Sequence, residues 1–139
     1  MSAHAFHEIF LHITWHNNHD CEITPTIEKM LHEIILSKCN TIDGIYVHEL
    51  GGTETHIHLA ISINPTIKIS DFIGLIKGHS SHEVKTRLND HPINWKKGYG
   101  VVSFSKRNLK LVKDYIINQK EHHKNNSIIQ KLEKFEEIS

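Results

Sequence analysis

The sequence predicts an α+β protein with a ferredoxin-like antiparallel sheet whose one face is covered by two helices. Two observations support this prediction. Stretches that alternate apolar and polar residues, as half-buried strands do, are separated by stretches whose apolar residues recur at helical spacing. Their order is strand, helix, strand, strand, helix, strand, then two more helices, and the first six follow the βαββαβ order. A third helix is expected beside the open face of the sheet.

The first strand and the first helix have clear signals. Residues 7–16 alternate strongly, with a core face and a polar face that carries histidines. Thr24 is a suitable N-cap, and Pro25 occupies the first helical position, where proline is tolerated. The helix that follows carries a stripe of apolar residues that should face the core: Ile27, Met30, Leu31, Ile34 and Ile35.

The second and third strands are predicted to form a hairpin. Residues 42–50 alternate, Gly51 and Gly52 are typical of a hairpin turn, and the third strand begins at Thr55. Pro65 should end that strand, since proline cannot donate to a sheet ladder.

The second half of the chain continues the pattern. Ser70 or Thr66 could cap a helix that reaches about Leu88, and residues 89–98 form a loop before a short strand over 99–105. Ser105 is then expected to cap a helix over 106–122. Ser127 should cap a last amphipathic helix whose apolar residues are Ile128, Ile129, Leu132 and Phe135. No domain boundary is evident, so residues 1–139 are interpreted as one domain.

The composition excludes several classes of protein. No apolar run is long enough to cross a membrane, and the N-terminus lacks the build of a signal peptide. Cys21 and Cys39 form no disulfide framework, which favours a cytoplasmic location. Lys plus Arg equals Asp plus Glu at 16 each, so net charge does not indicate a nucleic-acid partner. Histidine is unusually frequent, at 14 of 139 residues, and it is the commonest metal ligand.

His56 and His58 form the strongest candidate metal site. Because strand side chains alternate, both imidazoles point to the polar face of the third strand, where His12, His16 and His48 are also expected. In the helix over 106–122, Tyr115 and Gln119 lie one turn apart on one side. If this helix docks on the open face, the Gln119 carbonyl could complete an ion site with positions left open for catalysis. Tyr115 would then point at whatever the ion binds.

Several motifs resemble the single-tyrosine HUH transposases of the insertion-sequence 200/605 type and the related REP-associated tyrosine transposases. The strand Thr55-His56-Ile57-His58-Leu59 is similar to the motif that names this superfamily. The helix segment 77–81, the segment 95–105 with its Trp-x-x-Gly-Tyr-Gly start, and the segment 115–123 with its closing His-His pair also resemble that family. One departure is the segment 52–55, which lacks the Pro-Asp pair often found before the histidines.

The resemblance implies that Tyr115 attacks single-stranded DNA at hairpin ends of a mobile element and forms a 5′-phosphotyrosine link. It also implies a divalent ion, Mg²⁺ or Mn²⁺, held by His56, His58 and Gln119. The relatives form homodimers, and a DNA-bound enzyme would be associated with the nucleoid. Candidate DNA contacts combine basic side chains with aromatic platforms. They are Lys77, Trp95, Lys96, Lys97, Tyr99, Lys106 and Arg107.

Other interpretations stay open on the sequence alone. A domesticated relative could act as a hairpin-binding nuclease or regulator without transposition. An RNA-binding ferredoxin-like module would need aromatic residues on the open face, where Tyr46 is the one clear example. A structural metal site or a histidine pH sensor would give Tyr115 no role. No general base is evident, and His122 and His123 suit cations at the end of a helix.

Overall fold

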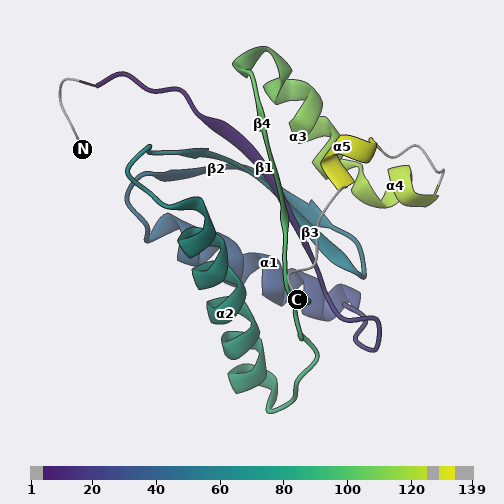
Figure 1. The fold of residues 1–139 in the computed structure, drawn as a ribbon. Coiled ribbons are helices and arrows are strands. Elements are labelled where there is room, and N and C mark those ends of the chain that lie inside the picture. The colour runs from purple at the N-terminus through teal and green to yellow at the C-terminus, as the bar shows by residue number, and fades with distance from the viewer. Residues whose placement is uncertain (1–4, 125–128, 134–139) are drawn as a thin grey trace.

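Four strands form one antiparallel sheet at the centre of the molecule (Figure 1). The structure is a computed structural model, and it describes residues 5–124 and 129–133. The strands lie in the order β2-β3-β1-β4, so β1 and β3 are central. This split βαβ arrangement confirms the predicted fold class. The strand bounds are β1 Phe10–His16, β2 Ile45–Gly52, β3 His56–Ile63 and β4 Gly100–Phe104.

Helices lie on both faces of the sheet. On one face, α1 (Pro25–Asn40) and α2 (Ile69–Leu88) pack against each other. The other face carries α3 (Leu109–Ile117), α4 (Gln119–Lys124) and α5 (Gln130–Glu133), as Figure 1 shows. A short 3-10 turn, Lys106–Asn108, connects β4 to α3. The prediction of two helices on one face and a further helix by the open face is confirmed.

The face beneath α1 and α2 holds the main apolar core. Alternate residues of β1 and β3 point into it, and the helical stripe of α1 packs on them. The Thr24 hydroxyl accepts a hydrogen bond from the backbone N–H of Ile27 at 3.3 Å, which confirms the predicted N-cap. In the core itself, fully burying one aliphatic side chain contributes about 1.5–3 kcal/mol to the stability of the fold. Members with 0% exposure are Ile13, Trp15, Leu31, Ile35, Cys39, Ile57, Leu59, Ile61, Ile76 and Val84.

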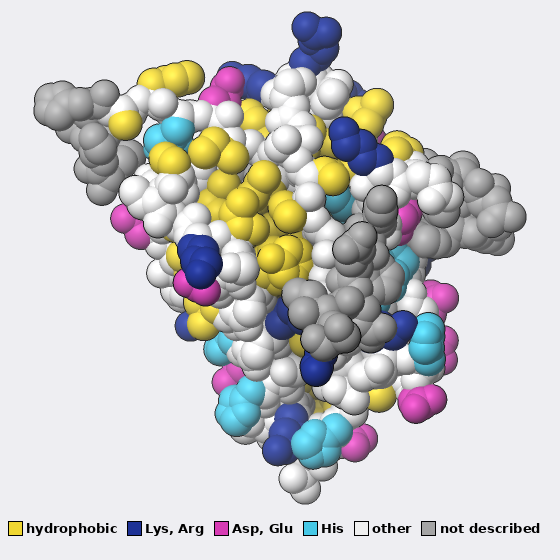
Figure 2. Space-filling model, in the orientation of Figure 1, with side chains coloured by type: hydrophobic (Ala, Val, Ile, Leu, Met, Phe, Trp, Pro, Cys, Tyr) yellow, Lys and Arg dark blue, Asp and Glu magenta, His cyan; other side chains and the backbone are white. Residues whose placement is uncertain are grey.

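Part of this core reaches the surface beside β4. Ile69, Tyr99 and Val101 pack on the core but are only partly buried. Figure 2 shows hydrophobic side chains gathered between α2 and β4. β4 lies at the edge of the sheet, and β1 is its one partner among the described strands. An edge strand beside an apolar surface is a place where a second chain can add.

The predicted hairpin turn at Gly51-Gly52 is wrong, because both glycines belong to β2 and pair with β3. The register shifts between Val47 and Glu49, so a bulge at His48 lengthens the strand. Gly51 instead allows close packing between the sheet and α3. A Cβ on Gly51 would lie 2.7 Å from the backbone oxygen of Ile116, so glycine at this position lets α3 approach the sheet.

Two other predicted boundaries also move. β1 begins at Phe10 and not at residue 7. Neither Ser70 nor Thr66 caps α2, because the helix begins at Ile69 and the Thr66 hydroxyl donates to Asn64 Oδ1 at 2.7 Å. The continuation of this helix to Leu88 is confirmed.

The predicted continuous helix over 106–122 is interrupted. Ser105 precedes the 3-10 turn and makes no side-chain cap bond, and α3 ends at Ile117. The backbone N–H and the side-chain amide of Asn118 both donate to the backbone oxygen of Asp114, at 3.0 and 2.9 Å. Such local side-chain bonds compete with regular helix. Tyr115 therefore lies on α3, and Gln119 is the first residue of α4.

The last predicted helix is described in part. Leu132 on α5 is buried, as its apolar pattern predicts. Ser127, Ile128 and Phe135 lie outside the described residues, as do the side chains of His122 and His123. Over the ranges 5–124 and 129–133, no helix has the length and apolar character needed to cross a bilayer.

Candidate active site

β3 brings His56 and His58 to the sheet face beneath α3 and α5. The two side chains are 2% and 0% exposed, because helices cover the sheet face that the βαββαβ order alone leaves open. Val112 and Ile116 of α3 pack on Ala60 of β3 and seat the helix there. Covering helices thus turn a polar strand face into a buried, histidine-rich site.

The Nδ1 atoms of both histidines have neighbours that fix the rings. His56 Nδ1 lies 2.9 Å from Thr53 Oγ1 and 2.8 Å from Thr55 Oγ1. His58 Nδ1 lies 2.7 Å from His12 Nε2. Burial, followed by the charge of His58, lowers the pKa of His12 to about 3, so the neutral His12 ring can accept a hydrogen bond from the N–H at His58 Nδ1. Both Nε2 atoms are thereby left for a ligand on the helix side.

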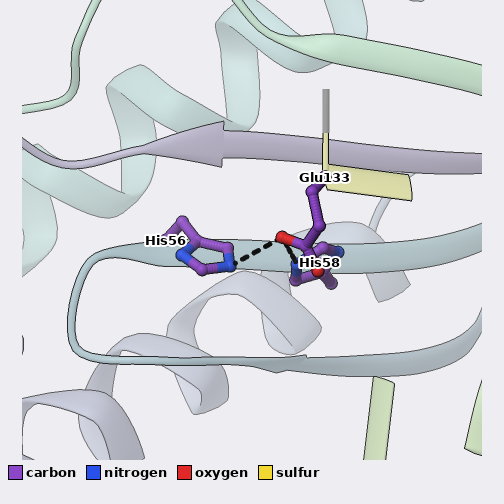
Figure 3. Close-up of side chains that lie close together, drawn as sticks. All are labelled: His56, His58 and Glu133. Atoms are coloured by element: carbon purple, nitrogen blue, oxygen red, sulfur yellow. Dashed lines mark hydrogen bonds and ion pairs between the residues drawn. The ribbon is translucent and has the colours of Figure 1, made fainter. Parts of the chain in front are cut away.

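A carboxylate completes this cluster, and the sequence did not reveal it. Glu133 Oε1 lies 3.2 Å from His56 Nε2 and 3.1 Å from His58 Nε2 (Figure 3). Burial disfavours the charged form, but hydrogen bonds from the two histidines outweigh it and hold the pKa of Glu133 well below its usual range. The carboxyl group is therefore ionised. The one sequence signal for it was its place after the apolar Leu132 on an amphipathic helix.

Tyr115 and Gln119 meet the second oxygen of the same carboxylate. The Tyr115 hydroxyl donates to Glu133 Oε2, and Gln119 Nε2 donates to it at 3.1 Å. The Tyr115 oxygen also accepts the backbone N–H of Ile129 at 3.0 Å. Burial and the Glu133 hydrogen bond raise the pKa of Tyr115 well above its usual value, so the phenol is neutral in this arrangement. The four predicted residues thus converge within one chain.

The donor set fits a divalent cation. One ligand atom from each of His56, His58 and Glu133 lies within 4.8 Å of the other two. Gln119 is 1% exposed, and its amide oxygen has no hydrogen-bond partner among the described residues, which is costly unless a ligand binds it. Two imidazoles with carboxylate and amide oxygens form a mixed nitrogen and oxygen set of the kind that binds divalent metal ions. The predicted ligand role of Gln119 stays a prediction.

Other histidines of this face support the site or lie beside it. The His16 ring stacks on His56 with centroids 4.6 Å apart. His48 lies farther along the sheet, where its Nε2 is 2.6 Å from Ser62 Oγ. Burial lowers the pKa of His16 to about 3, so it adds no positive charge next to His56.

The predicted DNA contacts lie outside this cluster, around the loop before β4. The Lys77 ammonium donates to the backbone oxygens of Lys96 and Gly98, at 2.8 and 3.0 Å. Trp95 Nε1 donates to the Lys77 backbone oxygen, and its ring meets Trp15 edge-on. Lys77 and Trp95 therefore hold this loop in place, and any DNA contact by them stays a prediction.

The remaining predicted contacts differ in accessibility. Lys96 Nζ lies 2.8 Å from His19 Nε2, and Tyr99 is half-buried. Lys97, Lys106 and Arg107 are exposed on the surface, with Lys106 Nζ 3.8 Å from a Glu8 oxygen. These three exposed side chains are long enough to reach a phosphate backbone, and their role also stays a prediction.

Comparisons with known proteins give results for sequence and for structure. Residues 5–119 match a family model described as "Transposase IS200 like". A Deinococcus radiodurans R1 protein, solved as a candidate transposase, is 20% identical over 86% of this chain and 96% of its own, with a TM-score of 0.66. A REP-associated tyrosine transposase bound to a REP hairpin is 16% identical over 88% of this chain and 74% of its own, with a TM-score of 0.64. No curated protein matches the chain.

Proposed function

The chain belongs to the IS200-like transposase family, and from this premise we propose that it cleaves and rejoins single-stranded DNA through a covalent link to Tyr115. The observation that carries the proposal is the convergence of the Tyr115 hydroxyl with His56, His58 and Gln119 in one buried cluster. A structural metal site would not need a tyrosine hydroxyl at this place. A strand-transfer enzyme does, because the phenol supplies the nucleophile.

The proposed reaction exchanges one phosphoester bond for another. The Tyr115 oxygen attacks the phosphorus, an oxygen–phosphorus bond forms, and the bond from phosphorus to the 3′-oxygen of the preceding nucleotide breaks. The phenol loses its proton and the departing 3′-oxygen gains one. The product is a 5′-phosphotyrosine beside a free 3′-hydroxyl, and attack by such a hydroxyl on the link rejoins strands. No external energy source is needed, since the number of phosphoester bonds is unchanged.

The residues around Tyr115 account for how this step is controlled. His56, His58 and Gln119 would hold the ion, Mg²⁺ or Mn²⁺. When bound, such an ion supplies positive charge for the scissile phosphate and for the departing oxygen. The buried phenol is neutral next to Glu133, so it is a weak nucleophile until a substrate phosphate changes its surroundings. We expect this to restrict attack to DNA that is correctly placed.

The substrate and the assembly extend the proposal. One similar structure has a REP hairpin bound, and we propose hairpin ends of a mobile element as the DNA that this chain recognises. Exposed Lys97, Lys106 and Arg107 are available for its phosphates. We also propose a homodimer in the cytoplasm, and the edge strand β4 with its apolar border offers a surface for it. Residues 1–139 would act as one catalytic domain.

A covalent-adduct assay tests the proposal. Single-stranded hairpin DNA, labelled on the 3′ side of the cleavage point, is incubated with the protein and Mn²⁺ and run on a denaturing gel. The wild type should give a labelled band that resists denaturant and is absent with EDTA. Tyr115→Phe should give none, whereas Tyr46→Phe should behave as wild type, because Tyr46 is 65% exposed on β2 away from the cluster. An adduct that survives Tyr115→Phe would remove the tyrosine from its proposed role.

A further inference from the structure

The carboxylate of Glu133 has no role in the function proposed so far, yet it occupies the centre of the site. One of its oxygens faces both imidazoles (Figure 3). The other oxygen accepts hydrogen bonds from Tyr115 and Gln119. We propose that Glu133 is a further protein ligand of the divalent ion, and that its second oxygen positions the Tyr115 hydroxyl. This inference rests on the proposed function, because it assigns a fourth ligand to the same ion.

The spacing of the nitrogen and oxygen atoms is that of neighbouring ligands on one ion. An octahedral ion with ligands at about 2.1 Å places adjacent ligand atoms about 3 Å apart. Glu133 Oε1 lies 3.2 Å from His56 Nε2 and 3.1 Å from His58 Nε2. The two distances from the carboxylate oxygen to the imidazole nitrogens are therefore those that a shared ion requires, and all three ligand atoms lie within 4.8 Å of one another. Glu133 thus needs no large movement to bind the ion.

Apolar packing and a backbone hydrogen bond fix the position of Glu133, in addition to its attraction to the two histidines. Leu132, the preceding residue, is 6% exposed, and α5 packs against β1 and β4. The backbone N–H of Ile129 donates to the Tyr115 oxygen and fixes the start of the same segment. Apolar packing and a backbone hydrogen bond thus bring the carboxylate into the site from two sides.

Charge favours a ligand role for this carboxylate. The set of His56, His58 and Gln119 is neutral, so it offers a divalent cation no compensating charge. Glu133 adds one negative charge next to two nitrogen donors, in a side chain that is only 10% exposed. Affinity for hard divalent cations rises with the number of charged oxygen ligands. One carboxylate would also link the nucleophile to the ion, because its other oxygen holds the Tyr115 hydroxyl.

The competing interpretation is that Glu133 blocks the site, occupying the place that a substrate phosphate needs. The two interpretations predict opposite effects on the free protein. Removing a ligand weakens ion binding, whereas removing a block leaves it unchanged or strengthens it. Ion binding in the absence of DNA therefore separates them without any measurement of cleavage.

The experiment is a Mn²⁺ titration of the full chain, followed by the electron paramagnetic resonance of the free ion. We compare wild type, His58→Ala, Glu133→Gln and Glu133→Asp. Glu33→Gln is the matched control, since Glu33 is exposed on α1 beyond the opposite face of the sheet. Circular dichroism and thermal melting confirm that each variant is folded.

The proposal predicts that Glu133→Gln weakens Mn²⁺ binding by about tenfold or more. Glu133→Asp should fall between Glu133→Gln and wild type, and Glu33→Gln should match wild type. Wild-type affinity or tighter binding in Glu133→Gln, with binding lost in His58→Ala, overturns the ligand role of Glu133 and leaves the proposed function intact. If wild type binds no Mn²⁺, or if His58→Ala binds as wild type does, the ion site of the proposed function fails together with this inference.

Discussion

His58 and Leu59 are neighbours on β3, both are 0% exposed, and they face opposite sides of the sheet. Leu59 enters a core built from two long helices and the apolar faces of the central strands. His58 enters a cluster of polar groups beneath three short helices, where it bonds to His12 and Glu133 and its ring contacts those of His56 and Tyr115. The comparison separates two uses of burial. On the apolar face, burial stabilises the fold. On the polar face, burial excludes water from the reactive groups and fixes their positions.

The faces should therefore respond differently to mutation. Changes on the apolar face should lower the free energy of unfolding and leave the site intact, whereas changes on the polar face should affect the site more than stability. The free energy of unfolding, measured by urea denaturation, should fall by decreasing amounts in the variants Ile35→Ala, Gly51→Ala, His12→Leu and Lys120→Met.

The largest loss of stability is expected for Ile35→Ala on α1. Ile35 is 0% exposed in the main core, and truncation leaves a cavity, so the free energy of unfolding should fall by about 2–5 kcal/mol. Mn²⁺ affinity, measured at urea concentrations too low to unfold the variant, should not change. A parallel loss of affinity in the folded variant would show that the two faces are not independent.

Gly51→Ala should cost about 1–3 kcal/mol, because the new methyl group would meet Ile116 of α3. Since Tyr115 precedes Ile116, the adduct yield with hairpin DNA should also fall. Gly74→Ala is the matched control. Gly74 lies in α2, and a methyl group added there would have nothing within 4 Å, so alanine should raise stability by about 0.5–1 kcal/mol and leave adduct yield unchanged. Equal adduct yield in both variants would contradict the close seating of α3.

His12→Leu should cost about 1 kcal/mol in stability, because it removes the acceptor of the His58 Nδ1 proton. Mn²⁺ affinity should fall by about tenfold, as it does when other groups that orient a metal ligand are removed. His12→Gln keeps an acceptor and should recover part of that affinity. An unchanged affinity in His12→Leu would argue that His58 keeps its orientation without His12.

The smallest effect is expected for Lys120→Met. The Lys120 ammonium on α4 lies 2.7 and 2.9 Å from the two carboxylate oxygens of Glu28 on α1, and the lysine side chain is 62% exposed. An exposed ion pair contributes about 0–1 kcal/mol, and salt screens it. The difference from wild type should shrink in 1 M NaCl. A difference that persists in high salt would indicate packing and not charge as its source.

The contrast between the apolar and the polar face of the sheet also explains which features could be predicted from the sequence. The apolar face follows from periodicity, so the order of elements, the Thr24 cap and the core stripe of α1 were predictable. Boundaries failed where a tertiary contact decides them. Gly51 has the local signal of a turn but is used for the approach of Ile116. Asn118 is the C-cap of α3, and its side-chain amide donates to the backbone oxygen of Asp114.

On the polar face, the sequence predicted the side chains that regular elements point at one another. His56 and His58 share a strand face, and Tyr115 and Gln119 still meet although the helix breaks between them. Glu133 was missed because no periodic pattern links it to His58 of β3, which lies 75 positions earlier in the chain. Its place depends on how α5 packs across β1 and β4, and local sequence does not encode that docking.

The central claim is that the polar face forms a strand-transfer centre with Tyr115 as the nucleophile. The most direct measurement is peptide mapping, by mass spectrometry, of the adduct formed with hairpin DNA and Mn²⁺ after digestion with trypsin and nuclease. Cleavage after Lys113 and Lys120 releases the peptide 114–120, in which Tyr115 is the one hydroxyl-bearing residue. The account predicts a nucleotide mass on this peptide through a 5′-phosphate. A nucleotide on any other peptide, such as those with Tyr46 or Tyr99, would contradict it.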